Sequence, residues 1–152
     1  MRKATEEIDE VDRRILLELI LDSRSSNRGI ATKLHLSTVT VINRIRRLEK
    51  LGIVRSYTAF LDHERLGYEL TVITELTVSK GKLLEMEQAI AKIPSVCAVY
   101  DVTGLTDAIV IGKFKNREEL SKFTKSLLTM PFVERTNTHI VLTTVKEDFR
   151  LL

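Results

Sequence analysis

Apolar residues in the N-terminal third of the chain recur every three or four positions, which is the spacing of amphipathic helices. Asp9 suits a helix N-cap, and the helix that follows it should end near Asp22, because residues 23–27 are loop and cap residue types. A second, shorter helix is expected over residues 27–35. The spacing therefore predicts a helical N-terminal domain.

A third helix is predicted over residues 38–50, with Ser37 as its N-cap and Gly52 as its stop. Its apolar residues fall on one side at helical spacing. They are Val41, Ile42, Ile45 and Leu48. A short helix, a tight turn and a capped third helix are typical of a helix-turn-helix.

Beyond residue 67 the pattern changes to strands that alternate with amphipathic helices. Pro94 and Pro131 are expected to stop the two helices. The predicted elements are strand 68–78, helix 82–93, strand 96–103, strand 107–114, helix 117–130 and strand 133–145. This βαββαβ order predicts an α+β ferredoxin-like domain, in which an antiparallel sheet carries both helices on one face.

The segment that connects the two parts differs from both in its residue pattern. Residues 53–61 alternate loosely and are extended in character, and Leu66 and Gly67 mark a turn. The predicted domains are 1–55, which is helix-turn-helix and winged-helix-like, a β-strand linker over 56–66, and an α+β domain over 67–152.

The uncovered face of the predicted sheet is also expected to be apolar. In residues 108–111 and 139–142, both alternating sets of positions include apolar residues. A large apolar face needs a cover, and another copy of the chain is the simplest candidate.

The excess positive charge lies entirely in the N-terminal part. Residues 1–65 carry 13 Lys and Arg against 10 Asp and Glu, whereas residues 66–152 carry 11 of each. Residues 28–55 hold seven basic side chains against one acidic side chain, Glu49. A positive surface concentrated in this way suits phosphates.

No signal peptide or membrane-spanning stretch is indicated, so a cytoplasmic protein is expected. The single cysteine, Cys97, lies in an apolar strand-like run and is expected to be buried. Enzyme, cofactor and metal chemistry are not predicted, because the histidines lie far apart and lack a Cys or His at metal-ligand spacing. These histidines are His35, His63 and His139.

The third helix is the strongest candidate for nucleic-acid binding. With its apolar residues inside, its polar side chains point outward, and their types suit base edges and phosphates. The predicted contacts are Ser37, Thr38, Thr40, Asn43, Arg44 and Arg47, with Arg28 and Lys33 as phosphate anchors. The alternative is a merely solvated helix, but such a helix tends to mix the signs of its charges.

Residues 103–107, Thr-Gly-Leu-Thr-Asp, connect two predicted strands. The simpler interpretation is a hairpin turn in which Gly104 takes a positive φ. The functional interpretation is a ligand loop, in which backbone N–H groups hold a carboxylate and Asp107 pairs with an ammonium group. The residues alone favour the hairpin.

Two motifs carry a resemblance to a known family. They are Ile8-Asp9-x-x-Asp12-x-x-Ile15-Leu16 and Leu36-Ser37-x-x-x-Val41-x-x-Arg44-Ile45-x-x-Leu48-Glu49-x-x-Gly52-Ile53. With Leu66-Gly67, Thr103-Gly104-x-x-Asp107, Thr136-x-Thr138 and Lys146-Glu147, they make the sequence similar to the Lrp/AsnC family of feast/famine regulators. The resemblance covers nearly the whole chain.

The resemblance implies a DNA-binding domain, a linker strand and an effector domain that binds an amino acid. It also implies dimers that associate into tetramers or octamers, and a palindromic operator in double-stranded DNA. The implied effector residues are Gly104, Leu105, Thr106 and Asp107, with Tyr100, Thr136 and Thr138 nearby. Leu105 and Thr106 depart from many members, which leaves the effector's identity open.

Together these observations predict a sequence-specific transcription regulator whose oligomeric state and DNA affinity respond to a small effector. The alternative is an amino-acid-binding subunit that docks on an enzyme through its N-terminal helices, because an acidic partner also suits the basic face.

Overall fold

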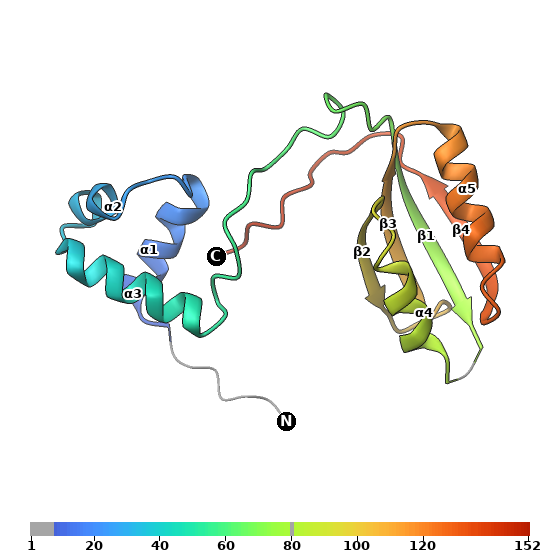
Figure 1. The fold of residues 1–152 in the computed structure, drawn as a ribbon, viewed down its shortest axis with the longest axis horizontal. Coiled ribbons are helices and arrows are strands. Elements are labelled where there is room, and N and C mark those ends of the chain that lie inside the picture. Colours follow the sequence, from blue (N-terminus) through green and yellow to red (C-terminus); the bar gives the residue numbers. More distant parts are fainter. Residues whose placement is uncertain (1–7, 80) are drawn as a thin grey trace. The chain divides into compact units, whose positions relative to one another are not determined.

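The computed structural model describes residues 8–79 and 81–152, so residues 1–7 of the predicted first domain lie outside the description. The chain forms two compact units (Figure 1). One consists of the residues up to Phe60 together with Glu147–Leu152, and the other of Leu61–Lys146. Within the described residues, no helix has the length and apolar character needed to cross a membrane.

The N-terminal unit contains the three predicted helices, α1 (Glu10–Leu21), α2 (Asn27–Leu34) and α3 (Thr38–Lys50). Local capping explains where they begin. The Asp9 carboxylate accepts a hydrogen bond from the backbone N–H of Asp12, whose own carboxylate accepts from the backbone N–H of Asp9. The predicted N-caps Asp9 and Ser37 are confirmed, and so is the stop at Gly52, which has a φ of 71°.

A small apolar core holds the three helices together. Each helix contributes buried side chains from one face, as amphipathic spacing requires. The core consists of Ile15, Ile30, Ala31, Leu34, Val41 and Ile45. Because the core uses the inner side of α3, the opposite side of that helix faces outward.

The C-terminal unit has the predicted βαββαβ order. Its elements are β1 (Leu70–Val78), α4 (Leu83–Ile90), β2 (Val96–Asp101), β3 (Ala108–Phe114), α5 (Arg117–Leu128) and β4 (Val133–Ile140). The four strands form one sheet in the order β2-β3-β1-β4, and every pairing is antiparallel. The predicted α+β ferredoxin-like class is therefore confirmed.

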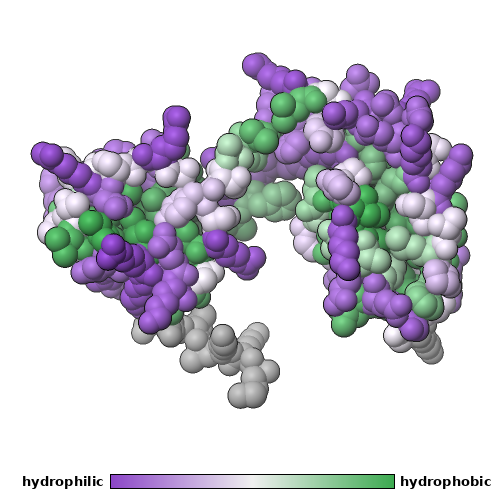
Figure 2. Space-filling view, viewed as in Figure 1, coloured by the Kyte–Doolittle hydropathy of each residue, from purple (hydrophilic) through white to green (hydrophobic). Residues whose placement is uncertain are grey.

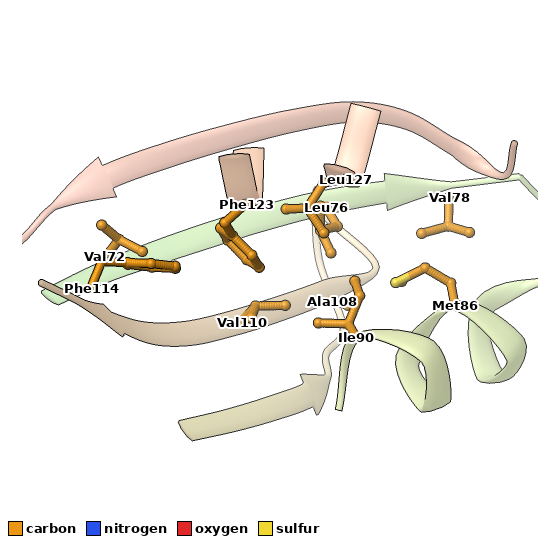
Figure 3. Close-up of a cluster of buried hydrophobic side chains, with 10 residues drawn as sticks. All are labelled: Val72, Leu76, Val78, Met86, Ile90, Ala108, Val110, Phe114, Phe123 and Leu127. Carbon is orange, nitrogen blue, oxygen red and sulfur yellow. The ribbon is translucent and has the colours of Figure 1, made fainter. Parts of the chain in front are cut away.

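Both helices of this unit cover the same face of the sheet. In β1 the alternate residues Val72, Thr74, Leu76 and Val78 are buried against them. Figure 3 shows the ten buried apolar side chains between the strands and the helices, including Met86 of α4. This layer is the main hydrophobic core of the chain.

The opposite face of the sheet, called here the open face, is lined by the odd-numbered residues of β1 and β3. The strand register places Ile73 beside Ile111 and Ile109 beside Tyr100 on this face. Ile73 and Tyr100 are among the exposed large hydrophobic residues. Towards β4 the face becomes polar, with Asn137 donating a hydrogen bond to Glu75. The predicted apolar character thus holds for the β2, β3 and β1 side.

Some local features differ from the expectations. Residues 53–61, all of which the structure describes, form no strand within one chain, which offers this segment no strand to pair with. The last strand ends at Ile140 rather than at residue 145. Cys97 is exposed rather than buried. The register of β2 against β3 shifts between Val96 and Ala98, and such a bulge turns the intervening side chain out of the regular alternation.

Two neighbouring leucines of α5 test the assignment of the core. Leu127 is 0% exposed and Leu128 is 60% exposed. Leu127→Ala should lower the free energy of unfolding by about 2–5 kcal/mol through lost burial and a cavity. Leu128→Ala should change it by no more than about 0.5 kcal/mol. Urea unfolding followed by circular dichroism measures both, and equal losses would contradict the assignment.

Candidate functional site

The outward side of α3 is defined by the side that the core occupies. Val41, Ile45 and Leu48 are buried, so the residues half a turn away on the helix face solvent. Four exposed residues share that outward face at spacings of four, three and four positions. They are Val39, Asn43, Arg46 and Lys50.

Arg44 and Arg47 lie to one side of this outward face and point to α1. The carboxylate of Asp12, which is fully buried, binds both arginines. Its Oδ1 atom lies 3.1 Å from Arg44 Nη1, and its Oδ2 atom lies 2.9 Å from Arg47 Nη1. Arg44 also pairs with Asp9, and this hydrogen bond holds the pKa of Asp9 below its ordinary value.

This cluster, Asp9, Asp12, Arg44 and Arg47, connects the first helix to the third. The two carboxylates of the α1 capping box each bind an arginine of α3, across more than thirty positions of sequence. A buried carboxylate is stable only with such compensation. The cluster therefore fixes the rotation of α3, and with it the residues that face outward.

The other predicted contact residues lie at the start of α3 and on α2. Ser37 and Thr40 bond to each other at the start of α3, with 2.8 Å between their hydroxyl oxygens. Thr38 and Arg28 are exposed. Lys33 is exposed as well, and its Nζ atom lies 2.6 Å from a carboxylate oxygen of Glu18.

Three residues of the outward face were not among the predicted contacts: Val39, Arg46 and Lys50. The signal was present, because they share helical spacing with Asn43, which was predicted. Hydrophilic side chains gather over α3 in the surface view of the N-terminal unit (Figure 2).

The acid of this helix, Glu49, accepts a hydrogen bond from the Tyr57 hydroxyl at 2.8 Å. Burial and this carboxylate raise the pKa of Tyr57 to about 12.

The predicted ligand loop forms the hairpin between β2 and β3. Gly104 has a φ of 135°, which favours glycine, and Leu105 is fully exposed. The Asp107 carboxylate accepts a hydrogen bond from the Val78 backbone N–H at 2.8 Å. Asp107 thus ties the loop to the end of β1.

The remaining predicted effector residues lie apart within one chain. Tyr100 is on β2, at one edge of the sheet, and belongs to the open face. Thr136 and Thr138 are on β4, at the other edge, and belong to the helix-covered face. The Thr138 hydroxyl lies 3.0 Å from that of the buried Thr74. A single chain therefore does not bring Tyr100 together with these two threonines.

A cavity of about 880 Å³ lies in the N-terminal unit, not beside the predicted effector residues. Its mostly apolar lining comes from the end of α1, residues 53–60 and residues 150–152. The Arg150 guanidinium lies 5.2 Å from the centre of the Phe60 ring, so the C-terminal residues pack against the linker. Among the residues that the structure describes, no three His, Cys, Asp or Glu side chains gather in a way that suits a metal ion.

A capped basic helix on a three-helix unit, joined to a separate ferredoxin-like unit, is the architecture of a helix-turn-helix regulator with a regulatory domain. The comparisons agree with this class. Residues 8–49 match the AsnC-type helix-turn-helix domain, and residues 71–151 match the Lrp/AsnC ligand binding domain. The chain belongs to the Lrp/AsnC family of transcription regulators, and it is not an enzyme.

The relatives cover almost the full chain. A helix-turn-helix transcriptional regulator of Pyrococcus furiosus is 50% identical over 95% of this chain and 98% of its own length. The leucine-responsive regulatory protein of Escherichia coli is 31% identical over 99% of this chain and 94% of its own. A regulator of Neisseria meningitidis, solved in complex with L-methionine, superposes with a TM-score of 0.88 at 28% identity, over 96% and 97% of the two chains.

The buried Asp12 gives the N-terminal unit a specific sensitivity. The double substitution Arg44→Ala and Arg47→Ala removes both arginines that bind this carboxylate, and should lower the free energy of unfolding by about 3–5 kcal/mol. Arg46→Ala, a change of the same type at an exposed position, should cost no more than about 0.5 kcal/mol.

Chemical unfolding of the full chain, followed by the helical circular dichroism signal, distinguishes the two variants. If the double variant is as stable as Arg46→Ala, the ion-pair cluster does not hold α1 and α3 together.

Proposed function

We propose that this protein binds a palindromic DNA operator as a dimer or larger assembly, and that an amino-acid effector changes that assembly and the DNA affinity. The outward face of α3 carries the proposal. It lies on a capped helix and presents Asn43 beside the basic side chains Arg46 and Lys50, which suits base edges flanked by phosphates.

In a dimer, two copies of α3 would enter successive major grooves, about 34 Å apart on one face of the DNA. The contact set consists of the predicted residues and the neighbouring outward residues Val39, Arg46 and Lys50. The predicted members are Ser37, Thr38, Thr40, Asn43, Arg44 and Arg47, with Arg28 and Lys33 at phosphates. Arg44 and Arg47 pair with Asp12 through Nη1, and because a guanidinium carries five N–H donors, this pairing is compatible with contacts to DNA.

The open face supports assembly through the C-terminal unit. It combines Ile73, Ile109 and Ile111 over neighbouring strands, and apolar surface of this kind is stabilised by burial against a second copy. Assembly also brings sheet edges of different chains within reach of one another, so Tyr100 of one chain and Thr136 of another can lie together although they lie apart within one chain.

The effector proposal follows from that separation. The matching family domain is a ligand binding domain, and the Neisseria relative was solved with L-methionine. If Tyr100 of one chain and Thr136 of another share a ligand, the ligand binds tightly only when the chains are correctly apposed. Ligand binding and assembly are then thermodynamically linked, and DNA affinity follows assembly through multivalency.

Selection of genomic fragments tests the DNA function. Purified protein is equilibrated with sheared genomic DNA at 50 and 200 mM salt, and bound fragments are sequenced. We expect one palindromic motif at both salt concentrations. The Asn43→Ala variant should select that motif weakly, because the amide that reads a base is lost. Sequence-independent binding that disappears at the higher salt would contradict the proposal.

Mixing of two variants tests the shared effector site. Tyr100→Ala and Thr136→Ala should each abolish the change in assembly size that an amino acid produces, measured by light scattering against an amino-acid panel that begins with L-methionine. When the two variants are mixed and allowed to exchange subunits, about a quarter of the sites should contain both native residues.

Partial recovery of the amino-acid response in the mixture is therefore the expected result. Two inactive variants that remain inactive after subunit exchange would place both residues in a site within one chain. A native protein that responds to no amino acid in the panel would contradict the effector proposal itself.

A further inference from the structure

The most exposed apolar side chain of α3 is Val39, which is 65% exposed on the outward face. Of the other apolar residues of this helix, Val41, Ile45 and Leu48 are buried and Ile42 is partly buried. A β-branched residue is also a weak choice for an exposed helix position on propensity alone. Val39 therefore contributes neither to the core nor to helix formation, which leaves its side chain available to a partner.

The neighbours of Val39 indicate the chemistry of its partner. On the same outward face follow Asn43, Arg46 and Lys50, all exposed, so the apolar patch is small and is followed by an amide and two cations. An apolar protein surface would not match the two cations, whereas a polyanion would. Double-stranded DNA combines phosphates with one apolar group in its major groove, the C5-methyl of thymine.

The position of Val39 along the helix fits this partner. It is the second residue of α3, and the N-terminal residues of a recognition helix are those that contact base edges. A valine side chain is short, so it can contact a base only where the helix approaches the groove closely. Four residues further on, about 6 Å along the helix, lies Asn43, whose amide can form two hydrogen bonds with adenine.

We infer that Val39 reads the C5-methyl of a thymine in each operator half-site, about two base pairs from an adenine read by Asn43. A separation of about 6 Å along the helix corresponds to about two base pairs of DNA. Arg46, one turn beyond, then contacts a guanine or a phosphate. This inference rests on the proposed DNA-binding function and deepens it, because it names the residue and the base that give part of the specificity.

Deoxyuridine provides the test, since it differs from thymidine only by the C5-methyl group. Each thymine of the operator selected by the native protein is replaced in turn by uracil, and the dissociation constant is measured by fluorescence anisotropy. At one thymine position per half-site, the native protein should bind about four-fold more weakly for each methyl lost. The Val39→Ala variant should bind the thymine and uracil forms equally.

Lys50→Ala is the matched control on the same face. It should bind all operators more weakly, because a cation is lost, but it should keep the four-fold preference for thymine. Both changes lie at exposed positions, and equal thermal unfolding of the three proteins establishes that folding is intact.

The outcomes separate the role of Val39 from the DNA-binding function. Loss of thymine discrimination in Val39→Ala alone supports the inference. A native protein that binds its operator but ignores every uracil overturns the inference and leaves the DNA-binding function intact. The same holds if Val39→Ala retains full discrimination, since another side chain then reads the methyl. A native protein that selects no operator defeats the proposed function instead.

Discussion

The arrangement of the N-terminal unit depends on the ion pairs of one buried carboxylate, that of Asp12. It accepts a hydrogen bond from the Asp9 backbone N–H in the capping box of α1, and it also binds Arg44 and Arg47 of α3. Apolar burial holds one side of α3 against the core, and two hydrogen-bonded ion pairs to one buried group add directional contacts that apolar packing lacks. The cluster therefore determines that Asn43 and its neighbours face outward, and it leaves guanidinium groups close to that face.

In the C-terminal unit the corresponding constraint is the one-sided covering of the sheet. Both helices pack on the face that carries Leu76 and Val110, which leaves the open face with Ile73 and Ile111 for the second chain proposed above. Tyr100 and Thr136 lie at opposite edges and on opposite faces of the sheet, so a ligand that contacts both needs residues from two chains. Under the proposed function, effector binding is therefore linked to assembly.

The sequence predicted what depends on local chemistry and failed where distant groups decide. The capping residues and the limits of α3 were correct because capping acts within four residues. The ion pairs of Arg44 and Arg47 could not be foreseen, because their partner lies more than thirty positions away. The expected linker strand is absent from residues 53–61, since a strand needs a neighbour, and the bulge at Cys97 follows from pairing with β3. Val39 was overlooked although helical spacing alone places it beside Asn43.

Chemical methylation of the bound operator shows whether the outward face of α3 lies in the major groove. Dimethyl sulfate methylates guanine at N7 in the major groove and adenine at N3 in the minor groove, so one reagent reports on both grooves. We expect protection of guanine N7 in two patches about ten base pairs apart, with adenine N3 still reactive there. Protection of adenine N3 with guanine N7 unaffected would contradict it.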